Sequence, residues 1–378
     1  MHPDVLVVGF GPAGASVAAA AAAAGCNVLA VERRAVIGAP VQCAEFVSSV
    51  LSIDALSWAS VGSVPIERMV TVVEGEPAEV TDDFRGRMIS RLLFDQALAR
   101  RAIARGARCI TGTGVTRVLA DGTVRLSDGR EMRPRVLVGA DGPRSRIGAA
   151  IMSANREFVA TRQVTVRLTQ PHDATDIFLR AAYRGGYAWL FPRGPVANVG
   201  IGVDYAGREC LKPLLSDLVA ELVAAGRIAP RAAERLTGGL IPVGGRLRAI
   251  GRLGRVPVLL AGDAAGLTNP VTGAGIDVAV CSGQLAGAAV AKWLAGDSAA
   301  IDDYEDELAA LYDPAYARAL RRRRDLLSCG AGGRPSVAML RRAWISAPEY
   351  WSESRTPNPS ASAPEWTGSQ SCAPSARA

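Results

Sequence analysis

The stretch VLVVGFGPAG, residues 5–14, constrains the fold more than any other part of the 378-residue chain. Its four apolar residues are typical of a buried parallel strand. Gly9, Gly11 and Gly14 then lead into an alanine-rich segment that is typical of a helix. A second apolar strand, residues 27–31, ends at Glu32. A strand, a glycine-rich turn, a helix and a second strand that ends in an acid predict a βαβ unit that binds a dinucleotide.

Each position of this motif has a physical role. Gly9 permits the tight turn, Gly11 lets the backbone approach a pyrophosphate, and Gly14 lets the helix pack on the strand. The free N–H groups at the helix start attract phosphates, and Glu32 can accept hydrogen bonds from ribose hydroxyls. The residues that we expect to bind the dinucleotide here are Gly9, Gly11, Pro12, Ala13, Gly14, Glu32 and Arg33.

Two later segments repeat the pattern of a buried strand that stops at a glycine turn. The first, VLVGADGPRSRIG (136–148), places Asp141 and Gly142 in its turn. The second, VLLAGDAAGLTNPVTGAGIDVA (258–279), places Asp263 after a strand and a glycine turn before a helix. Asp263 is then positioned to bond a sugar-like diol chain, while the helix start faces a ring system, and this combination fits FAD better than NAD. The expected ligands in this segment are Asp263, Gly273, Ala274, Gly275 and Ile276.

Strand-forming sequence of the nucleotide-binding type is interrupted and then resumes, which predicts one domain built from separated segments. Residues 159–203 read as antiparallel sheet, and 90–106, 211–225, 273–295 and 301–327 as helices, the first with Leu93, Ala97, Leu98 and Ala102 on its apolar face. The expected fold class is α/β with an α+β second domain. We expect a Rossmann-type FAD-binding domain from 1–62, 91–155 and 250–300, an antiparallel-sheet substrate domain from 63–90 and 156–249, a helical segment 301–352 and a disordered tail 353–378.

Composition excludes several classes of function. The net charge is +7, and nearly all of the basic residues are arginines. Aromatic residues make up only 5%, and no alternation of basic and aromatic residues indicates a nucleic-acid surface. Seven cysteines without a CxxC pair and two histidines argue against a metal site and against histidine-based catalysis. No apolar run reaches the about 18 residues of a membrane span, and the N-terminus lacks the basic region of a signal peptide, so we expect a cytoplasmic protein.

The three motifs in this order are similar to the FAD-dependent p-hydroxybenzoate hydroxylase superfamily. Two further stretches, PVQCAE (40–45) and GGYAWLFPRGPVANVGIGV (185–203), resemble the geranylgeranyl reductase family, and the resemblance covers roughly residues 4–325. The resemblance implies an enzyme that reduces isoprenoid double bonds with FAD. One departure is Gln42-Cys43-Ala44, where the family commonly has Arg-Cys-Gly.

The resemblance also implies roles for single residues. Gln42 and Cys43 would lie beside the flavin, and Arg91 would contact its ribityl and phosphate region. Tyr187, Trp189, Phe191 and Pro192 would line the substrate face, with Cys43, Tyr187 and Trp189 as the catalytic candidates. From the residues alone, Cys43 is equally well a small buried hydrophobe. Tyr187 and Trp189 alternate along a strand and so share one face.

We therefore expect an FAD-dependent oxidoreductase in which reduced flavin delivers hydride to a C=C bond of an apolar, isoprenoid-like small molecule or lipid. The reductant would be transiently bound NAD(P)H or a ferredoxin-type donor protein, since only one dinucleotide fingerprint is present. Two alternatives stay open: a flavin-dependent monooxygenase of an aromatic or polyketide-like substrate, and a non-catalytic flavin-binding protein. The run RALRRRRD (318–325) reads as a solvated helix face or as a peripheral contact with anionic lipid.

Overall fold

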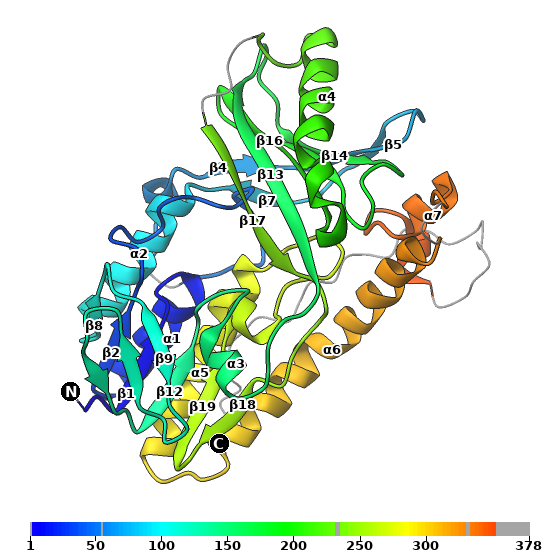
Figure 1. Cartoon of the computed structure of the whole chain (residues 1–378). Coiled ribbons are helices and arrows are strands. Elements are labelled where there is room, and N and C mark those ends of the chain that lie inside the picture. The colour runs from blue at the N-terminus through cyan, green and yellow to red at the C-terminus, as the bar shows by residue number, and fades with distance from the viewer. Residues whose placement is uncertain (1, 54–55, 231–234, 330–332, 353–378) are drawn as a thin grey trace.

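The computed structural model describes residues 2–53, 56–230, 235–329 and 333–352. Two large sheets dominate these residues, one in the lower and one in the upper part of Figure 1. Residues 353–378, expected to form a disordered tail, lie outside the described residues. The structure thus bears on the two expected sheet systems but not on the expected tail.

The first sheet is the parallel sheet predicted around the glycine motif. Its six strands run in the order β18 (Ile250–Leu253), β19 (Val256–Leu260), β12 (Val136–Gly139), β1 (Val5–Val8), β2 (Val28–Val31) and β8 (Arg108–Ile110). All neighbours pair in parallel except β18 and β19. Because β1, β2 and β12 are buried along their whole length, their continuous apolar sequences agree with a sheet covered on both faces.

Helices and a small meander cover this sheet. Helices α1 (Pro12–Ala23), α2 (Arg91–Ala104) and α5 (Ile276–Leu294) lie beside it, and α1 packs against both of the others. The predicted meander of 115–132 is present as β9 (Val115–Val118), β10 (Val124–Leu126) and β11 (Glu131–Met132), and the short α3 (Arg146–Ala150) contacts both β9 and β12. These elements place the ends of β1, β12 and β19 at one edge.

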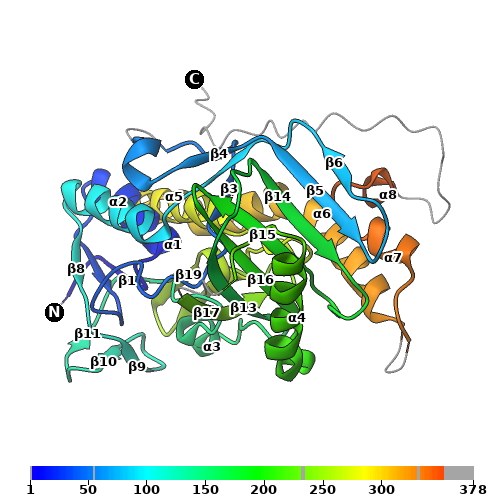
Figure 2. The same ribbon diagram turned by 90° about the horizontal axis from the view of Figure 1, so that it is seen from above.

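The second sheet has seven strands and is antiparallel except where β14 meets β5. Its order is β17 (Arg235–Pro242), β13 (Phe158–Arg167), β16 (Val196–Asp204), β15 (Ala188–Arg193), β14 (Ala174–Leu179), β5 (Arg68–Val73) and β6 (Glu79–Thr81). Helix α4 (Leu211–Ala224) packs on β13 and β16 through Leu211, Leu215, Leu218 and Leu222 (Figure 2). A smaller sheet joins β3 (Phe46–Ser48), β7 (Gly86–Met88) and β4 (Val64–Ile66), and 3₁₀ turns lie at η1 (Trp58–Val61), η2 (Tyr205–Cys210) and η3 (Gly262–Ala265).

The 28-residue helix α6 (Ala300–Leu327) runs from the first sheet towards the second in Figure 1, and the short helices α7 (Val337–Arg342) and α8 (Pro348–Trp351) follow it. The predicted helices at 211–225 and 301–327 are confirmed within one residue at each end. The helix expected from Gly273 begins only at Ile276, because Gly273 has a φ of +70° and belongs to the preceding turn. No helix in the described part of the chain has both the length and the apolar character that a membrane crossing requires.

The apolar face predicted for the helix at 90–106 is partly wrong. Phe94, Leu98 and Ala102 are buried at spacings of four residues, whereas Leu93 is 39% exposed. Leu93 lies about 100° around the helix axis from Phe94 and therefore points away from the buried stripe. The sequence pattern indicated a helix correctly but misplaced the direction of that stripe.

Candidate functional site

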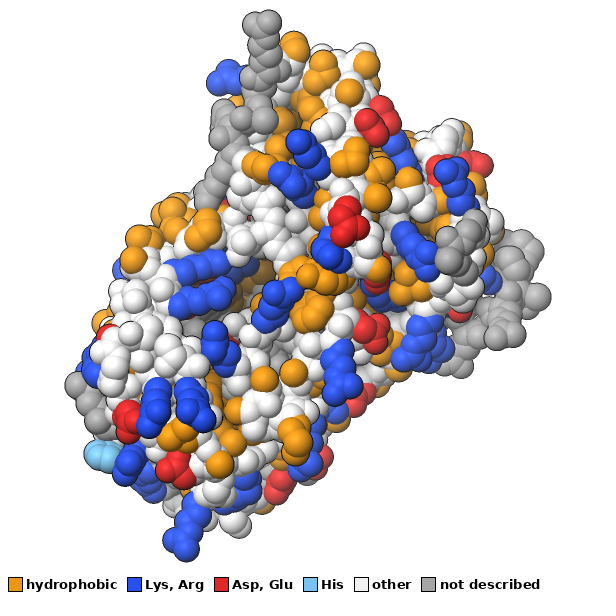
Figure 3. Space-filling model, viewed as in Figure 1, with side chains coloured by type: hydrophobic (Ala, Val, Ile, Leu, Met, Phe, Trp, Pro, Cys, Tyr) orange, Lys and Arg blue, Asp and Glu red, His pale blue; other side chains and the backbone are white. Residues whose placement is uncertain are grey.

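A cavity of about 2320 Å³ lies between the two large sheets. Its walls come from the ends of β1, β12 and β19 on one side and from β13, β14, β15 and β17 on the other. Figure 3 shows Lys and Arg side chains spread over the molecular face between the regions of the two large sheets. The cavity therefore brings together segments that are hundreds of residues apart.

The glycines of the first motif shape one end of this cavity. Gly9 has a φ of +91°, and a Cβ atom there would overlap the carbonyl oxygen of Ala140. A Cβ on Gly14 would overlap the carbonyl oxygen of Gly9, so the close helix-strand packing expected of this residue is present. On Gly11, in contrast, a Cβ would have no heavy atom within 4 Å, and this residue borders the cavity together with Pro12 and Ala13. This end is therefore a surface of bare backbone that is open to a ligand.

Glu32 is held rigidly just after the end of β2. Its Oε2 accepts a hydrogen bond from the Phe10 amide at 2.9 Å and its Oε1 accepts one from the Arg34 amide at 2.9 Å. Each carboxylate oxygen retains a further lone pair, so the group can still accept from hydroxyls in the cavity. Arg33 follows it and also lines the cavity.

The second motif supplies a turn in which Asp141 acts mainly within the protein. Its carboxylate accepts from Ser145 Oγ at 2.5 Å and from the Arg146 amide at 2.7 Å, so it fixes the start of α3. Burial raises the pKa of Asp141, and these hydrogen bonds oppose the rise. Gly142 has a φ of +84° and an open cavity side. The residue that offers backbone to a ligand in this turn is therefore Gly142.

The third motif forms the middle of the cavity wall. Asp263 Oδ1 accepts from Thr268 Oγ1 at 3.0 Å, while Asp263 Oδ2 has no donor among the described residues. Burial raises the pKa of Asp263, and both Thr268 and the Arg91 guanidinium oppose that rise. Helix α5 starts after Gly275 without a side-chain cap, so its first N–H groups are available to a ligand. The predicted residues Gly273, Ala274, Gly275 and Ile276 all border the cavity here.

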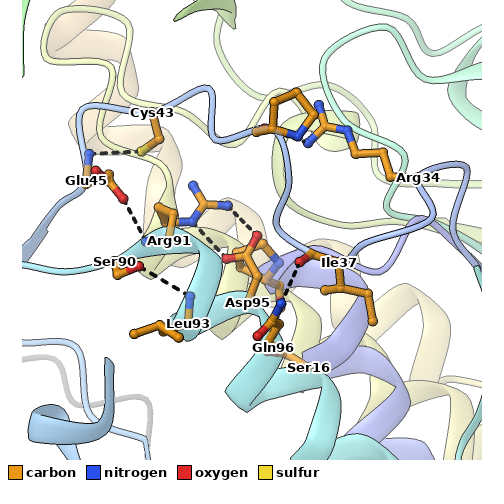
Figure 4. A network of polar contacts seen from close by, with 12 residues as sticks. Ser16, Arg34, Ile37, Cys43, Glu45, Ser90, Arg91, Leu93, Asp95 and Gln96 are labelled. Carbon is orange, nitrogen blue, oxygen red and sulfur yellow. Dashed lines mark hydrogen bonds and ion pairs between the residues drawn. The ribbon is translucent and has the colours of Figure 1, made fainter. Parts of the chain in front are cut away.

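Cys43 and Arg91 lie together near the first turn of α2 (Figure 4). Arg91 makes two hydrogen bonds to Asp95, from Nε to Oδ1 at 2.8 Å and from Nη2 to Oδ2 at 2.9 Å. Glu45 Oε1 accepts from the Arg91 amide at 2.9 Å, and Cys43 Sγ accepts from the Glu45 amide at 3.2 Å. Burial raises the pKa of the Cys43 thiol, an effect that the nearby Arg91 charge only partly offsets. Cys43 is therefore a protonated thiol at neutral pH.

Four residues that sequence reasoning missed hold the Cys43 loop. Gln163 Nε2 donates to Cys43 O at 3.1 Å. Asn198 Nδ2 donates to Ala44 O at 3.2 Å and to Glu45 Oε2 at 3.1 Å, and Arg193 Nη1 lies 3.2 Å from the same carboxylate oxygen. The residues missed are Glu45, Gln163, Arg193 and Asn198. A signal existed for one of them, because Asn198 is a polar residue inside the otherwise apolar strand β16, where a buried side chain needs a partner.

Gln42 occupies the rim beside this loop. Its Nε2 donates to Gly238 O at 2.7 Å, and its Oε1 accepts from Arg34 Nη2 at 2.7 Å. The side chain therefore bridges the loop to β17 and still borders the cavity. A glutamine suits this position because the bridge needs both a donor and an acceptor.

An aromatic wall forms the other end of the cavity. Tyr187 and the β15 residues Trp189 and Phe191 line it; the ring centroids of Tyr187 and Trp189 are 5.7 Å apart, and those of Trp189 and Phe191 are 6.2 Å apart. Pro192, expected in the substrate pocket, does not border the cavity, because side chains alternate along a strand and Pro192 points to the opposite face. Tyr187 Oη donates to Thr272 O at 2.6 Å, and Trp189 Nε1 donates to Gln163 Oε1 at 3.1 Å. The polar groups of the wall are thus satisfied, and burial raises the pKa of Tyr187 so that it stays neutral.

The C-terminal helices close this end, which the sequence did not indicate. Trp344 packs on Tyr187 with ring centroids 4.7 Å apart, and Tyr350 and Trp351 border the cavity beyond it. Arg322 Nη2 donates to Glu349 O and to Ser352 O, each at 2.6 Å, and so fixes α8. The wall is therefore complete only with residues after 327.

The arginine run at 318–325 is only in part the predicted solvated face. Arg321 and Arg324 are exposed, whereas Arg322 is partly buried and Arg323 is buried, and the predicted lipid contact stays a prediction. Arg323 is 4% exposed, donates to Gly185 O and pairs with Asp204 at 2.9 Å. Among the described residues, no three His, Cys, Asp or Glu side chains gather in a way that would hold a metal ion.

Comparison with known proteins identifies the family. Residues 157–229 match the family model of the geranylgeranyl reductase catalytic domain, and residues 4–182 match that of lycopene cyclase protein. A digeranylgeranylglycerophospholipid reductase of Methanopyrus kandleri is 33% identical over 348 residues, which cover 85% of this chain and 86% of that protein. The enzyme of the same name from Methanocella arvoryzae is 32% identical, over 81% of this chain and 82% of its own.

The chain belongs to the geranylgeranyl reductase family. A solved structure of a geranylgeranyl bacteriochlorophyll reductase-like protein from Thermoplasma acidophilum agrees, with a TM-score of 0.78, 25% identity and coverage of 90% of this chain and 89% of that one. A probable FAD-dependent monooxygenase from Pseudomonas aeruginosa shares the fold at a TM-score of 0.66, with 20% identity over 86% of this chain and 97% of its own. The expected α/β fold, the family and an oxidoreductase of this type are thus confirmed.

The cofactor of this family member is a flavin, and the cavity has the features that FAD needs. Gly11 and Gly142 leave open space beside bare backbone, the start of α5 is uncapped, and Asp263 Oδ2 has no protein donor among the described residues. The same cavity extends from Glu32 to the aromatic wall.

Proposed function

We propose that the protein is an FAD-dependent reductase of C=C bonds in an apolar, isoprenoid-like substrate. The observation that carries this proposal is one cavity that joins a backbone cradle at one end to an aromatic wall at the other, with Cys43 among the residues that line it. Hydrogen bonds through Glu45 connect Cys43 to Arg91, and hydrogen bonds through Gln163 connect it to Trp189 of the aromatic wall. The relatives' names, which state reduction of a digeranylgeranylglycerophospholipid, support the same reaction class.

The cradle residues would hold FAD by its successive parts. The backbone from Gly9 to Gly14 would face the pyrophosphate and Glu32 the adenosine ribose, with Arg33 beside it. Asp263 and Arg91 would face the ribityl chain, and the backbone of Gly142 would approach the cofactor from the adjoining turn. Gln42 and the turn of Gly273, Ala274, Gly275 and Ile276 would surround the ring system, and the start of α5 would stabilise the charge of the reduced ring by about 0.3–2 kcal/mol. Asp141 would act indirectly, by holding the turn that carries Gly142.

The aromatic end would bind the isoprenoid chain. Tyr187, Trp189 and Phe191 offer ring surface, and each CH₂ group removed from water contributes about 0.8 kcal/mol. Bound FAD in its reduced form supplies the hydride. The other carbon of the double bond needs a proton, and the buried Cys43 thiol is the proton-bearing group that we assign to it, while Tyr187 and Trp189 position the double bond.

The reductant is part of the proposal. NAD(P)H and a ferredoxin-type protein are both anionic, and Arg33 and Arg144 line the cavity with no carboxylate partner among the described residues. Either donor would therefore be attracted to the cradle end. The cytoplasmic location and a peripheral membrane contact, which the sequence predicts, stay predictions. So do the domain boundaries, which are supported by the separate segments that build each sheet.

The test is anaerobic turnover of purified, FAD-loaded protein with dithionite and a prenyl lipid extract, followed by mass analysis. A reductase adds two hydrogen atoms per turnover without oxygen. A monooxygenase on this scaffold would be inactive until oxygen is admitted and would then add one oxygen atom. A non-catalytic flavoprotein would bind FAD stoichiometrically and give no product with any reductant, and either of these outcomes contradicts the proposal.

A further inference from the structure

Arg318 is an unusual residue of the aromatic end. It lies on α6, borders the cavity and is half-buried, with its guanidinium carbon 5.1 Å from the centroid of the Trp351 ring. No carboxylate pairs with it among the described residues. The other inward-facing arginines of the same run differ, since Arg322 and Arg323 are bonded to carbonyl groups and Arg323 also to Asp204. Of these three arginines, Arg318 presents its charge to the cavity.

Two other cavity arginines, unlike Arg318, are paired with carboxylates, and Arg33 and Arg144, which have no such partner within the described part of the chain, belong to the cradle end. Arg91 is paired with Asp95, and Arg85 is paired with Asp83 at 3.0 Å. A carboxylate that also borders the cavity, Asp277, accepts instead from Ser48 Oγ. A guanidinium stacked on an aromatic ring keeps its in-plane N–H groups free, and these match a phosphate in a bidentate manner. In the described part of the aromatic end, the Arg318 fork therefore has no anion from the protein.

A continuous path connects Arg318 to the proposed reaction centre. Trp351, which lies against Arg318, donates from Nε1 to Ile345 O at 2.9 Å, and Ile345 follows Trp344. Trp344 in turn packs on Tyr187. An apolar chain lying along these side chains would have one end near Cys43 and the other at Arg318.

We propose that Arg318 binds a phosphate group at the head of the isoprenoid substrate and so sets how far the chain reaches towards the flavin. This inference rests on the proposed function. The phosphate could belong to a prenyl diphosphate or to a glycerophospholipid, because both present the same group to the guanidinium. Arg318 is then a specificity-determining residue, since an uncharged prenyl alcohol makes no use of it.

The experiment compares Arg318→Gln with Arg318→Lys and with the control Arg321→Gln, which removes one charge from an exposed position of the same helix. Each variant is assayed with geranylgeraniol, geranylgeranyl diphosphate and digeranylgeranylglyceryl phosphate. We expect Arg318→Gln to lower kcat/KM for phosphorylated substrates by about 10- to 100-fold and for the alcohol by less than about 2-fold. Arg318→Lys should recover part of the loss, and Arg321→Gln should match the wild type.

A loss confined to the diphosphate, or to the glycerophospholipid, supports the proposal and identifies the source of the phosphate. An equal loss on all three substrates, or no loss on any, overturns it. Failure of the wild type to reduce any substrate would contradict the proposed function instead. A binding measurement tests the phosphate subsite directly. Hexadecyl phosphate should bind the wild type more tightly than hexadecanol, as followed by tryptophan fluorescence. If Arg318→Gln keeps that preference, the subsite is absent.

Discussion

The two ends of the cavity are built on different principles. The cradle end consists mainly of backbone from three strand ends, with glycines where a Cβ would overlap a neighbouring carbonyl or block a ligand. The aromatic end consists of side chains from β15, the C-terminal helices and the Cys43 loop, which come from distant parts of the sequence. The cofactor site thus depends mainly on backbone geometry, whereas the substrate site depends on side-chain packing.

This contrast determines how each end should respond to substitution. At the cradle a methyl group on Gly9 or Gly14 meets rigid backbone, which cannot move aside cheaply, and one on Gly11 or Gly142 occupies ligand space. At the aromatic end side chains can repack, so truncations should produce graded losses. Substitutions at the cradle should therefore cost the most, and those along the aromatic wall the least.

The first prediction separates two glycines of the same motif. Gly9→Ala should destabilise the apo-protein by about 2–4 kcal/mol, because it combines a left-handed backbone with overlap against Ala140. Gly11→Ala should leave the apo-protein within about 0.5 kcal/mol of the wild type, yet weaken FAD binding by about 10- to 100-fold. Chemical denaturation of the apo-proteins and FAD titration measure the two effects.

These glycine variants serve as controls for each other, since both add one methyl group. If Gly11→Ala destabilised the apo-protein as much as Gly9→Ala, the open space at Gly11 would not be a ligand surface. If it bound FAD normally, the assignment of the pyrophosphate to this turn would be wrong.

The second prediction concerns the group between the two ends. Cys43→Ser should retain FAD but reduce kcat by about 100-fold or more, since a serine hydroxyl is a much weaker acid than a thiol. Cys43→Ala should show the same loss in kcat. Because serine keeps the size of the side chain and alanine does not, equal losses would indicate loss of the proton donor and not of packing. Rapid reaction of the reduced protein with substrate measures the step directly, and near-wild-type rates in both variants would assign Cys43 a packing role.

The pH dependence of the same step has a definite sign. Burial raises the pKa of Cys43 above its ordinary value of 9.0, so the thiol keeps its proton beyond that pH. The wild-type rate should therefore be flat from neutral pH to 9.0 and fall only above the raised pKa. The same shift contributes stability at low pH that is lost as pH rises through the folded-state pKa. Cys43→Ser should lose the alkaline decline in rate.

The third prediction tests the link between the Cys43 loop and the aromatic wall. Gln163→Leu removes the donor to Cys43 O and the acceptor for Trp189 Nε1, and should lower kcat by about 10-fold. Trp189→Phe removes only the second contact and should cost about 3-fold. In the double variant the losses should not add, because the two side chains share one hydrogen bond. Additive losses would show that Gln163 does not couple the two.

The same contrast explains what the sequence could predict. The roles of Gly9 and Gly14 follow from residue spacing, since a strand, a turn and a helix within ten residues have few conformations. The contributions of Glu45 and Trp344 do not, because the ion pair of Glu45 with Arg193 and the ring contact of Trp344 with Tyr187 arise only when distant segments pack together. Pro192 was wrongly assigned to the substrate pocket because the resemblance covers the whole Tyr-x-Trp-x-Phe-Pro motif. The side chains of a strand, however, alternate between its two faces.

That division along β15 can be tested with two mild substitutions. Phe191→Ala should raise KM by about 3- to 10-fold, because it removes ring surface from the cavity, while leaving FAD affinity unchanged. Pro192→Ala should change KM and kcat by less than about 2-fold, since its side chain lies on the face away from the cavity, and should lower stability by about 1 kcal/mol at most. Steady-state kinetics and thermal unfolding of both variants provide the measurement. A larger KM change in Pro192→Ala than in Phe191→Ala would mean that the substrate contacts the opposite face of the sheet, and the aromatic end would then not be the substrate site.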